Sequence, residues 1–181
     1  SGGAGSADTL VMSYTDAISA ALVSSLENQI SEFERLTLLS AVSGTINLAN
    51  LDDINHVTTA AGNVDLDLDN MSSGGTVVLT GGNTNRTDVD FAANGANDVF
   101  NLSYVSGGAG FQHNVDLEGQ SVETVNISTA GSNPFSGNLQ LDGTTTINVS
   151  GNAGFNFLGI SDLTDVTLLN AANVTGTGLS G

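Results

Sequence analysis

A glycine-containing turn at residues 93–98 carries oxygen atoms at a spacing that suits a hard metal ion. Asn94, Asn97 and Asp98 can each offer a side-chain oxygen, and Gly95 lets the backbone curl and present its carbonyl groups. Apolar and polar residues alternate directly after the turn, which predicts a short strand. The pattern predicts a calcium-binding corner that leads into a strand, with an ordinary turn as the alternative interpretation.

Three aspartates alternate with apolar residues at 64–69. On a strand, Asp65, Asp67 and Asp69 would line one face while the apolar side chains line the other. Three like charges in a row are unfavourable without a counterion, so a calcium ion on this face is one hypothesis. The alternative is a solvated strand face that discourages edge-to-edge aggregation.

Asp88 and Asp90 repeat this alternation around Val89, and Arg86 could neutralise them in place of a metal ion. Asp116 follows a further glycine-rich segment at 107–110. The candidate calcium ligands that the sequence predicts are Asp8, Asp65, Asp67, Asp69, Asp88, Asp90, Asn94, Asn97, Asp98 and Asp116.

Catalytic signatures are absent from the sequence. His56 and His113 are the only histidines, and neither lies in a His-Glu-x-x-His pattern or near a nucleophile elbow. The many carboxylates could serve a polysaccharide-cleaving enzyme, but such sites usually also hold basic and aromatic residues, and the chain has no Lys or Trp. We therefore predict that the protein is not an enzyme.

The large excess of acidic over basic residues argues against further classes of function. Nineteen acidic residues face only Arg35 and Arg86, which gives a formal net charge of −17 at pH 7. Such a charge argues against binding nucleic acid or an anionic membrane, and bound divalent cations would relieve the self-repulsion. Cysteine is absent, so no disulfide or thiolate metal site can form. Because the sequence starts at Ser1 without Met, we expect it to be a processed or excised segment of a longer polypeptide.

Only one segment has a helical pattern. Ile18, Leu22, Leu26 and Ile30 recur every four residues, which predicts an amphipathic helix over 16–29 that covers an end or edge of a sheet. Thr15 or Asp16 is the expected N-cap.

The remaining chain has the composition of short strands joined by tight turns, with 23 glycines and a single proline. The expected strands lie at 33–40, 44–50, 63–69, 75–80, 87–91, 99–104, 114–118, 122–128, 138–142, 145–149 and 165–169. This spacing favours an all-β sandwich, barrel or solenoid.

The glycine-rich turns resemble the RTX nonapeptide Gly-Gly-x-Gly-x-Asp-x-Leu-x. Residues 2–10 match it with one extra residue before Asp8, and 94–100 match it with Asn in place of two positions. Residues 33–38 and 121–128 resemble rung strands of bacterial surface-layer solenoids. Together these segments resemble RTX-type, calcium-binding surface-layer (S-layer) and adhesin proteins. Because the copies are isolated, isolated ions rather than a continuous ion ladder are expected.

The resemblance implies an all-β β-solenoid or β-roll, with an RTX-like turn and helix in 1–32 and the solenoid in 33–181. It also implies Ca²⁺ as cofactor, secretion to the cell surface, self-assembly into a lattice or filament, and contact with a cell-surface polysaccharide. Nucleic-acid binding and membrane insertion are not expected. An adhesin module that binds a glycan or a surface is the alternative function, and a polysaccharide-active enzyme is a weaker one.

Overall fold

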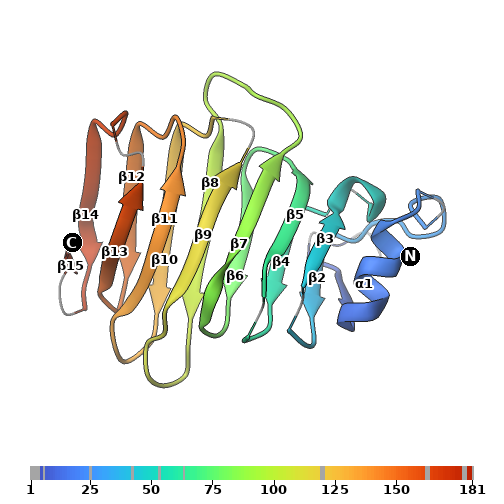
Figure 1. Ribbon diagram of the computed structural model, residues 1–181, viewed down its shortest axis with the longest axis horizontal. Helices are drawn as coiled ribbons and strands as arrows, with labels where there is room; N and C mark the ends of the chain where they lie inside the picture. The colour runs from blue at the N-terminus through green and yellow to red at the C-terminus, as the bar shows by residue number, and fades with distance from the viewer. Residues whose placement is uncertain are drawn as a thin grey trace.

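The protein is an elongated stack of short strands, with α1 (Tyr14–Ala21) at one end and β14 (Leu168–Val174) at the other (Figure 1). The computed structural model describes residues 5, 7–24, 26–41, 43–52, 54–62, 64–118, 121–161, 164–176 and 179–180. The RTX-like segment at 2–10 is therefore described only in part, because residues 2–4 and 6 lie outside these ranges.

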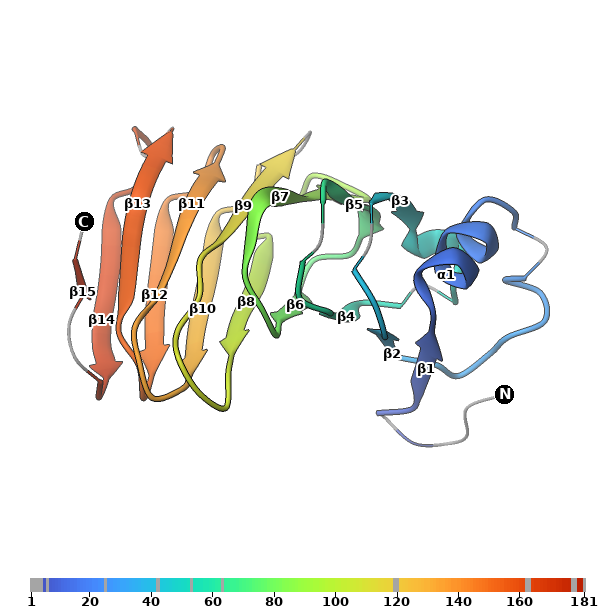
Figure 2. The same ribbon diagram turned by 60° about the horizontal axis from the view of Figure 1, so that its bottom comes forward.

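All the strands pair in parallel and form two sheets, which Figure 2 shows as two rows. Sheet A contains, in spatial order, β1 (Thr9–Met12), β2 (Arg35–Leu38), β4 (His56–Thr59), β6 (Gly75–Leu79), β8 (Val99–Val105), β10 (Thr124–Ala130), β12 (Thr146–Gly151) and β14. Sheet B contains β3 (Gly44–Asn47), β5 (Leu66–Met71), β7 (Asn83–Phe91), β9 (His113–Glu118), β11 (Phe135–Leu141), β13 (Phe155–Ser161) and β15 (Leu179–Ser180).

From β2 onward, consecutive strands alternate between the two sheets, so each turn of the chain adds one strand to each sheet. β1 and β2 both lie in sheet A, and α1 stands between them in the chain where a strand of sheet B would be expected. The result is a β-solenoid of about seven turns, which confirms the predicted all-β solenoid with one helix. β1 belongs to the expected N-terminal segment 1–32 and pairs with β2 in sheet A. The division at residue 33 stays a prediction.

The core lies between the two sheets and is built from stacked apolar rows. In sheet A one row consists of Leu36, Val57, Val77, Leu102, Ile127 and Val149, paired turn upon turn and all buried. In sheet B a matching row consists of Ile46, Leu68, Val89, Leu117 and Leu141. Each such side chain stabilises the fold by about 1.5–3 kcal/mol through burial. The period-2 alternation in the sequence is what places them inside.

Asparagines are stacked in the same way on the outside of sheet A. The side-chain amide of Asn126 donates to Asn101 Oδ1 at 2.9 Å, and that of Asn148 donates to Asn126 Oδ1 at 2.9 Å. Asn170 continues the ladder toward Asn148 at 3.4 Å. The hydrogen bonds of this ladder connect successive turns and help to fix the register of neighbouring strands.

The helix is shorter than the sequence pattern predicts. It spans Tyr14–Ala21 rather than 16–29, and Ser13 is its N-cap because the Ser13 hydroxyl accepts the Asp16 N–H at 3.3 Å. At its C-terminal end the amide of Asn50 donates to the Ala21 carbonyl at 2.8 Å. That bond satisfies a terminal carbonyl from outside the helix, so the helix can end there.

The predicted role of the helix is confirmed. Ala17 and Ala21 are buried, and α1 packs against β3, the first strand of sheet B, and against the 3₁₀-turn η1 (Leu48–Asn50). Figure 2 shows α1 beyond β3 in the row of sheet B, so it closes the N-terminal end of the core. Leu26 and Ile30 also pack on the core, although they lie outside the helix.

Several strand boundaries were predicted wrongly. β4 and β13 were not predicted, the expected strand at 44–50 ends as η1, and the strand expected at 165–169 lies at Leu168–Val174. The strand expected over 63–69 begins only at Leu66, because Asp65 has a φ of 48° and turns the chain before it. Local alternation cannot show where a turn of this kind interrupts a strand.

Candidate functional site

Aspartates from three neighbouring strands lie side by side on the outside of sheet B. Asp67 on β5 pairs with Asp88 on β7, which pairs with Asp116 on β9. Asp69 and Asp90 lie two residues further along β5 and β7, on the same side of the sheet. We call Asp67, Asp69, Asp88, Asp90 and Asp116 the acidic face. Adjacent strands are about 4.8 Å apart, so these carboxylates are close neighbours.

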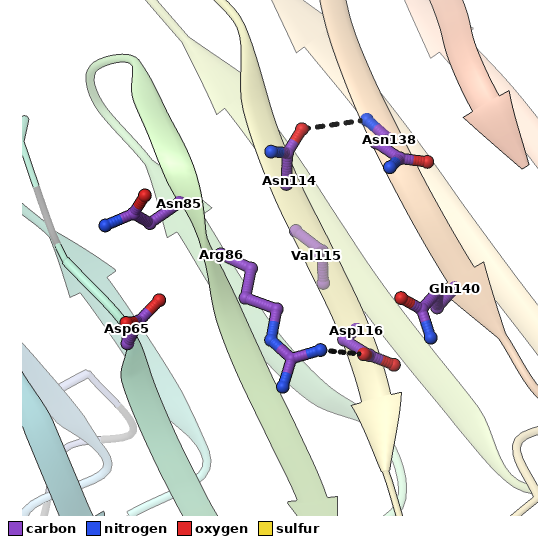
Figure 3. A pocket seen from close by; sticks show the side chains of 8 residues that line it. All are labelled: Asp65, Asn85, Arg86, Asn114, Val115, Asp116, Asn138 and Gln140. Carbon is purple, nitrogen blue, oxygen red and sulfur yellow. Dashed lines mark hydrogen bonds and ion pairs between the residues drawn. The ribbon is translucent and has the colours of Figure 1, made fainter. Parts of the chain in front are cut away.

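Arg86 bridges two of these strands. Its Nη1 lies 2.7 Å from Asp116 Oδ2 (Figure 3). Its Nε lies 2.8 Å from Asp88 Oδ1 on its own strand. Asp88 is 8% exposed and Asp116 is 5% exposed, whereas about half of the Arg86 side chain is exposed. The guanidinium therefore compensates two buried carboxylates that would otherwise be costly to keep charged. Of the two carboxylates that Arg86 was expected to neutralise, Asp88 and Asp90, the structure places Asp88 in an ion pair with it.

Among the described residues, the ion pairs of the acidic face involve Asp88 and Asp116 and not Asp67, Asp69 or Asp90. Asp67, Asp69, Asp88, Asp90 and Arg86 surround an open cavity of about 280 Å³. The pKa of Asp69 is raised, first by burial and then by the negative charges of Asp90 and Asp67. Thr45 donates a hydrogen bond to Asp67 Oδ2 at 3.0 Å. The surplus of negative charge makes this cavity attractive to a hard cation.

Within the part of the chain that the structure describes, no three acidic or histidine side chains converge on one metal position. A cation on the acidic face would therefore recruit its remaining oxygens from water or through side-chain rotation, because Ca²⁺ takes six to eight oxygen ligands.

Asp8 and Asp98 occupy equivalent corners, each directly before a strand of sheet A. The Glu34 carboxylate accepts the Asp8 N–H at 2.8 Å, and the Glu123 carboxylate accepts the Asp98 N–H at 2.8 Å. Each glutamate comes from the next turn, 26 and 25 residues later. Sequence reasoning missed both glutamates, and the length of one turn is the signal that would have found them.

The two aspartates use their own carboxylates differently. Asp98 is buried and accepts the N–H of Gly95, so it closes its own turn. Asp8 Oδ2 is shielded from solvent and has no hydrogen-bond partner among the described residues. The Asp98 carboxylate thus already performs the turn-forming role that was the alternative interpretation of this segment.

The predicted ligands do not form one site. Asp67, Asp69, Asp88, Asp90 and Asp116 are brought together on sheet B, whereas Asp8 and Asp98 lie at separate corners before sheet A. Asn94 and Asn97 are exposed in the turn before Asp98. Asp65 is wrongly predicted to share the strand face of Asp67 and Asp69, because it lies before β5 in a left-handed conformation.

His113 is a buried, hydrogen-bonded residue at the start of β9. Its Nε2 lies 2.9 Å from Thr87 Oγ1, its Nδ1 lies 3.1 Å from the Gly81 carbonyl, and burial lowers its pKa to about 4. Neutral imidazole can donate from Nδ1 to the Gly81 carbonyl and accept from the Thr87 hydroxyl at Nε2. His56 in β4 is partly buried, and burial together with Arg35 lowers its pKa.

No helix in the described ranges is long and apolar enough to cross a membrane. Comparisons with protein-family models, with curated proteins and with solved structures find no match for this chain. The fold and the geometry of its surfaces are therefore the basis on which a function can be inferred.

Proposed function

We propose that this chain is an extracellular structural protein, stabilised by calcium, that assembles with copies of itself into a surface layer or fibre. The observation that carries the proposal is the row Asp67–Asp88–Asp116 on adjacent strands, flanked by Asp69 and Asp90, in a chain of net charge −17. Arg86 contacts Asp88 and Asp116, and bound cations would offset the repulsion that Asp67, Asp69 and Asp90 still exert on one another.

Calcium suits this face because it binds carboxylate oxygens in flexible geometry and tolerates water ligands. Two unit charges about 5 Å apart repel by about 3 kcal/mol at the effective dielectric of a protein surface, and by about 1 kcal/mol in bulk water. A divalent ion between such carboxylates replaces repulsion by attraction. The pKa of Asp69 is raised first by burial and then, to a smaller extent, by the negative charges of Asp90 and Asp67.

The expected calcium affinity of the acidic face supports an extracellular location. Solvent-facing sites with few protein ligands bind calcium weakly, and extracellular calcium modules have dissociation constants of about 10⁻⁴–10⁻³ M. Such sites fill at the calcium concentrations found outside cells and stay empty at cytosolic ones. The absence of cysteine accords with a protein whose stability comes from cations.

The ends of sheet A support self-association. β1 and β14 are its outermost strands, so within the described part of the chain each has one edge without a strand neighbour. On β14, Leu168 and Leu169 are 51% and 53% exposed, and Leu169 lies opposite the buried Ile147. After Asp142 the sequence contains only Asp162 and Asp165 as charged residues, so repulsion between two copies is weakest there. We therefore propose that a second copy of this chain binds at the β14 end of sheet A.

The test compares assembly with calcium, with magnesium and with excess EDTA, by sedimentation velocity and negative-stain microscopy. Ordered assemblies are expected with calcium at millimolar concentration and not with EDTA or with magnesium alone. The variant Asp67→Asn/Asp69→Asn/Asp90→Asn should need at least tenfold more calcium, while Ser128→Ala on sheet A serves as the matched control. Unchanged fold and assembly in EDTA would refute the role of calcium.

A further inference from the structure

The outer surface of sheet B has a second recess beside the acidic face, with a different chemistry. Its volume is about 200 Å³, and its walls include Asp65, Arg86, Asn114, Asp116, Asn138 and Gln140. Figure 3 shows these side chains on β7, β9 and β11, with Asp65 on the far side of β7. We call this recess the amide groove. We propose that it binds an uncharged saccharide, independently of the proposed calcium-dependent assembly.

The strands place the polar groups of the groove in a regular grid. Arg86 lies opposite Asn114, and Asp116 lies opposite Gln140. Asn138 comes two residues before Gln140 on β11, on the same outward side. Because neighbouring strands are about 4.8 Å apart, the groove offers hydrogen-bonding groups at short, repeated intervals across three strands.

The groove is preorganised by contacts that exist without a ligand. Arg86 is held by Asp88 and Asp116 at 2.8 and 2.7 Å, and Asn114 Oδ1 accepts the backbone N–H of Asn138 at 3.1 Å. Val115, at the base of the groove, is buried. Side chains that are already fixed lose little conformational entropy when a ligand binds, so more of the contact energy remains as affinity.

Asn138 and Gln140 are the adaptable part of the groove. Both residues are exposed, and neither side-chain amide is hydrogen-bonded to another of the described residues. Each amide offers a carbonyl acceptor and an N–H₂ donor. A ligand hydroxyl both donates and accepts hydrogen bonds through one oxygen atom. Each amide can therefore bind two neighbouring hydroxyls of a ligand, one through its carbonyl and one through its N–H₂ group.

Charge selects against ionic ligands. Asp65, Asp116 and Arg86 give the lining a net charge of −1, and Asp88 directly behind Arg86 makes the surroundings more negative. An anion such as a uronate would be repelled. The groove is also less attractive to a metal ion than the acidic face, because its lining holds two carboxylates beside Arg86, whereas the cavity of the acidic face holds four. An uncharged polyhydroxyl compound avoids the repulsion and uses the donors and acceptors together.

The size of the groove limits how much ligand it can hold. Pockets for drug-sized ligands measure about 300–1,000 Å³, so about 200 Å³ suits one sugar unit of a longer chain. Single-unit affinity should be weak, and an assembly that displays many copies of the groove would bind a polysaccharide through multivalency.

The test is affinity electrophoresis of the purified protein in native gels that contain dextran, mannan, galactomannan or xyloglucan, with polygalacturonate as the anionic polymer. Migration is expected to be retarded by at least one neutral polymer, in EDTA as well as in calcium, and not by polygalacturonate. The variant Asn138→Ala/Gln140→Ala should reduce the retardation at least fivefold. Both substituted residues are exposed, so far-UV circular dichroism should be unchanged.

Ser128→Ala, on the outer side of sheet A, is the matched control and should bind like the wild type. The proposal is overturned if no neutral polymer retards the protein, if the double variant binds as well as the control, or if retardation requires calcium. It is also overturned if the double substitution abolishes calcium binding in isothermal titration, because the groove would then be a cation site. Failure of calcium-dependent assembly leaves the saccharide result unaffected, so the two proposals are tested separately.

Discussion

Arg86 and Asp116 join β7 to β9 through a contact of 2.7 Å between Nη1 and Oδ2. The same guanidinium contacts Asp88 on its own strand at 2.8 Å. One of only two basic residues in the chain therefore compensates the two buried carboxylates of the acidic face.

The first prediction concerns this pair. Arg86→Met keeps most of the aliphatic side chain but leaves Asp88 and Asp116 buried without a cation. We expect the free energy of unfolding in urea, in EDTA at pH 7, to fall by about 2–3 kcal/mol, because the cost of an uncompensated buried charge exceeds that of a surface pair. Millimolar calcium should restore part of the loss. Arg35→Met, at the outer side of β2, is the control and should change stability by less than about 0.5 kcal/mol.

The second prediction concerns the pH dependence of stability at His113. Its pKa is lowered from 6.5 to about 4 in the folded protein, so the unfolded chain binds a proton that the folded chain does not between these values. The contribution of neutral His113 is therefore fully present above pH 6.5 and is lost as the pH falls from 6.5 to about 4. The loss amounts to about 3 kcal/mol at about 1.4 kcal/mol per pKa unit.

The measurement is urea unfolding between pH 7 and pH 4 for the wild type and for His113→Asn. Carboxylates titrate in the lower part of this range in both proteins, so the difference between the two curves isolates the histidine. The wild type should lose more stability than the variant on acidification. Parallel curves would contradict the assignment of the lowered pKa to His113.

The third prediction concerns the close packing around Gly137 on β11. A methyl group at this position would meet the His113 carbonyl at 2.6 Å and the Tyr104 hydroxyl at 2.7 Å. It would displace the hydrogen bond that Tyr104 donates to His113 at 3.1 Å. Gly137→Ala should therefore lower the midpoint of thermal unfolding, with a stability loss of about 1–3 kcal/mol. Gly107→Ala, where nothing lies within 4 Å of the new carbon, should leave the midpoint nearly unchanged.

The fourth prediction concerns the asparagine ladder on sheet A. Asn126 both accepts from Asn148 and donates to Asn101, each at 2.9 Å. Asn126→Ala removes two hydrogen bonds and should cost about 1–2 kcal/mol at about 1 kcal/mol for each bond. Ser128→Ala on the same side of the same strand should cost less than about 0.5 kcal/mol. Equal effects of the two substitutions in urea unfolding would show that the ladder contributes nothing specific.

The fold class was predictable because each strand of a solenoid has apolar residues facing the core and polar residues facing solvent, and this alternation is visible in the local sequence. The alternation at Val99–Val105 and Thr124–Ala130 follows from inward and outward pointing side chains, and both segments are strands. The register was not predictable, because the partner of each strand lies about one turn away in the sequence. The pairing of Asp88 with Asp116 is an example, since nothing local to either residue encodes it.

The helix boundary was missed for a related reason. The four-residue spacing continues through Leu22 and Leu26, but Leu22 is 74% exposed and the helix ends before it. The bond from Asn50 to the Ala21 carbonyl that closes the helix comes from 29 residues away. Similarly, the alternation at 64–69 indicated a single carboxylate face, whereas the positive φ of Asp65 removes that residue from the strand.

The parallel pairing of the strands has a mechanical consequence. Backbone hydrogen bonds between turns run along the long axis of the stack, while each strand runs across it (Figure 1). Tension between the two ends of the chain therefore detaches one terminal turn at a time and opens the bonds in sequence. Tension applied across the axis instead shears all the bonds of a strand together. The resistance of the molecule to mechanical unfolding therefore depends on the direction of the force. A layer of such molecules resists force best when the load runs parallel to the strands.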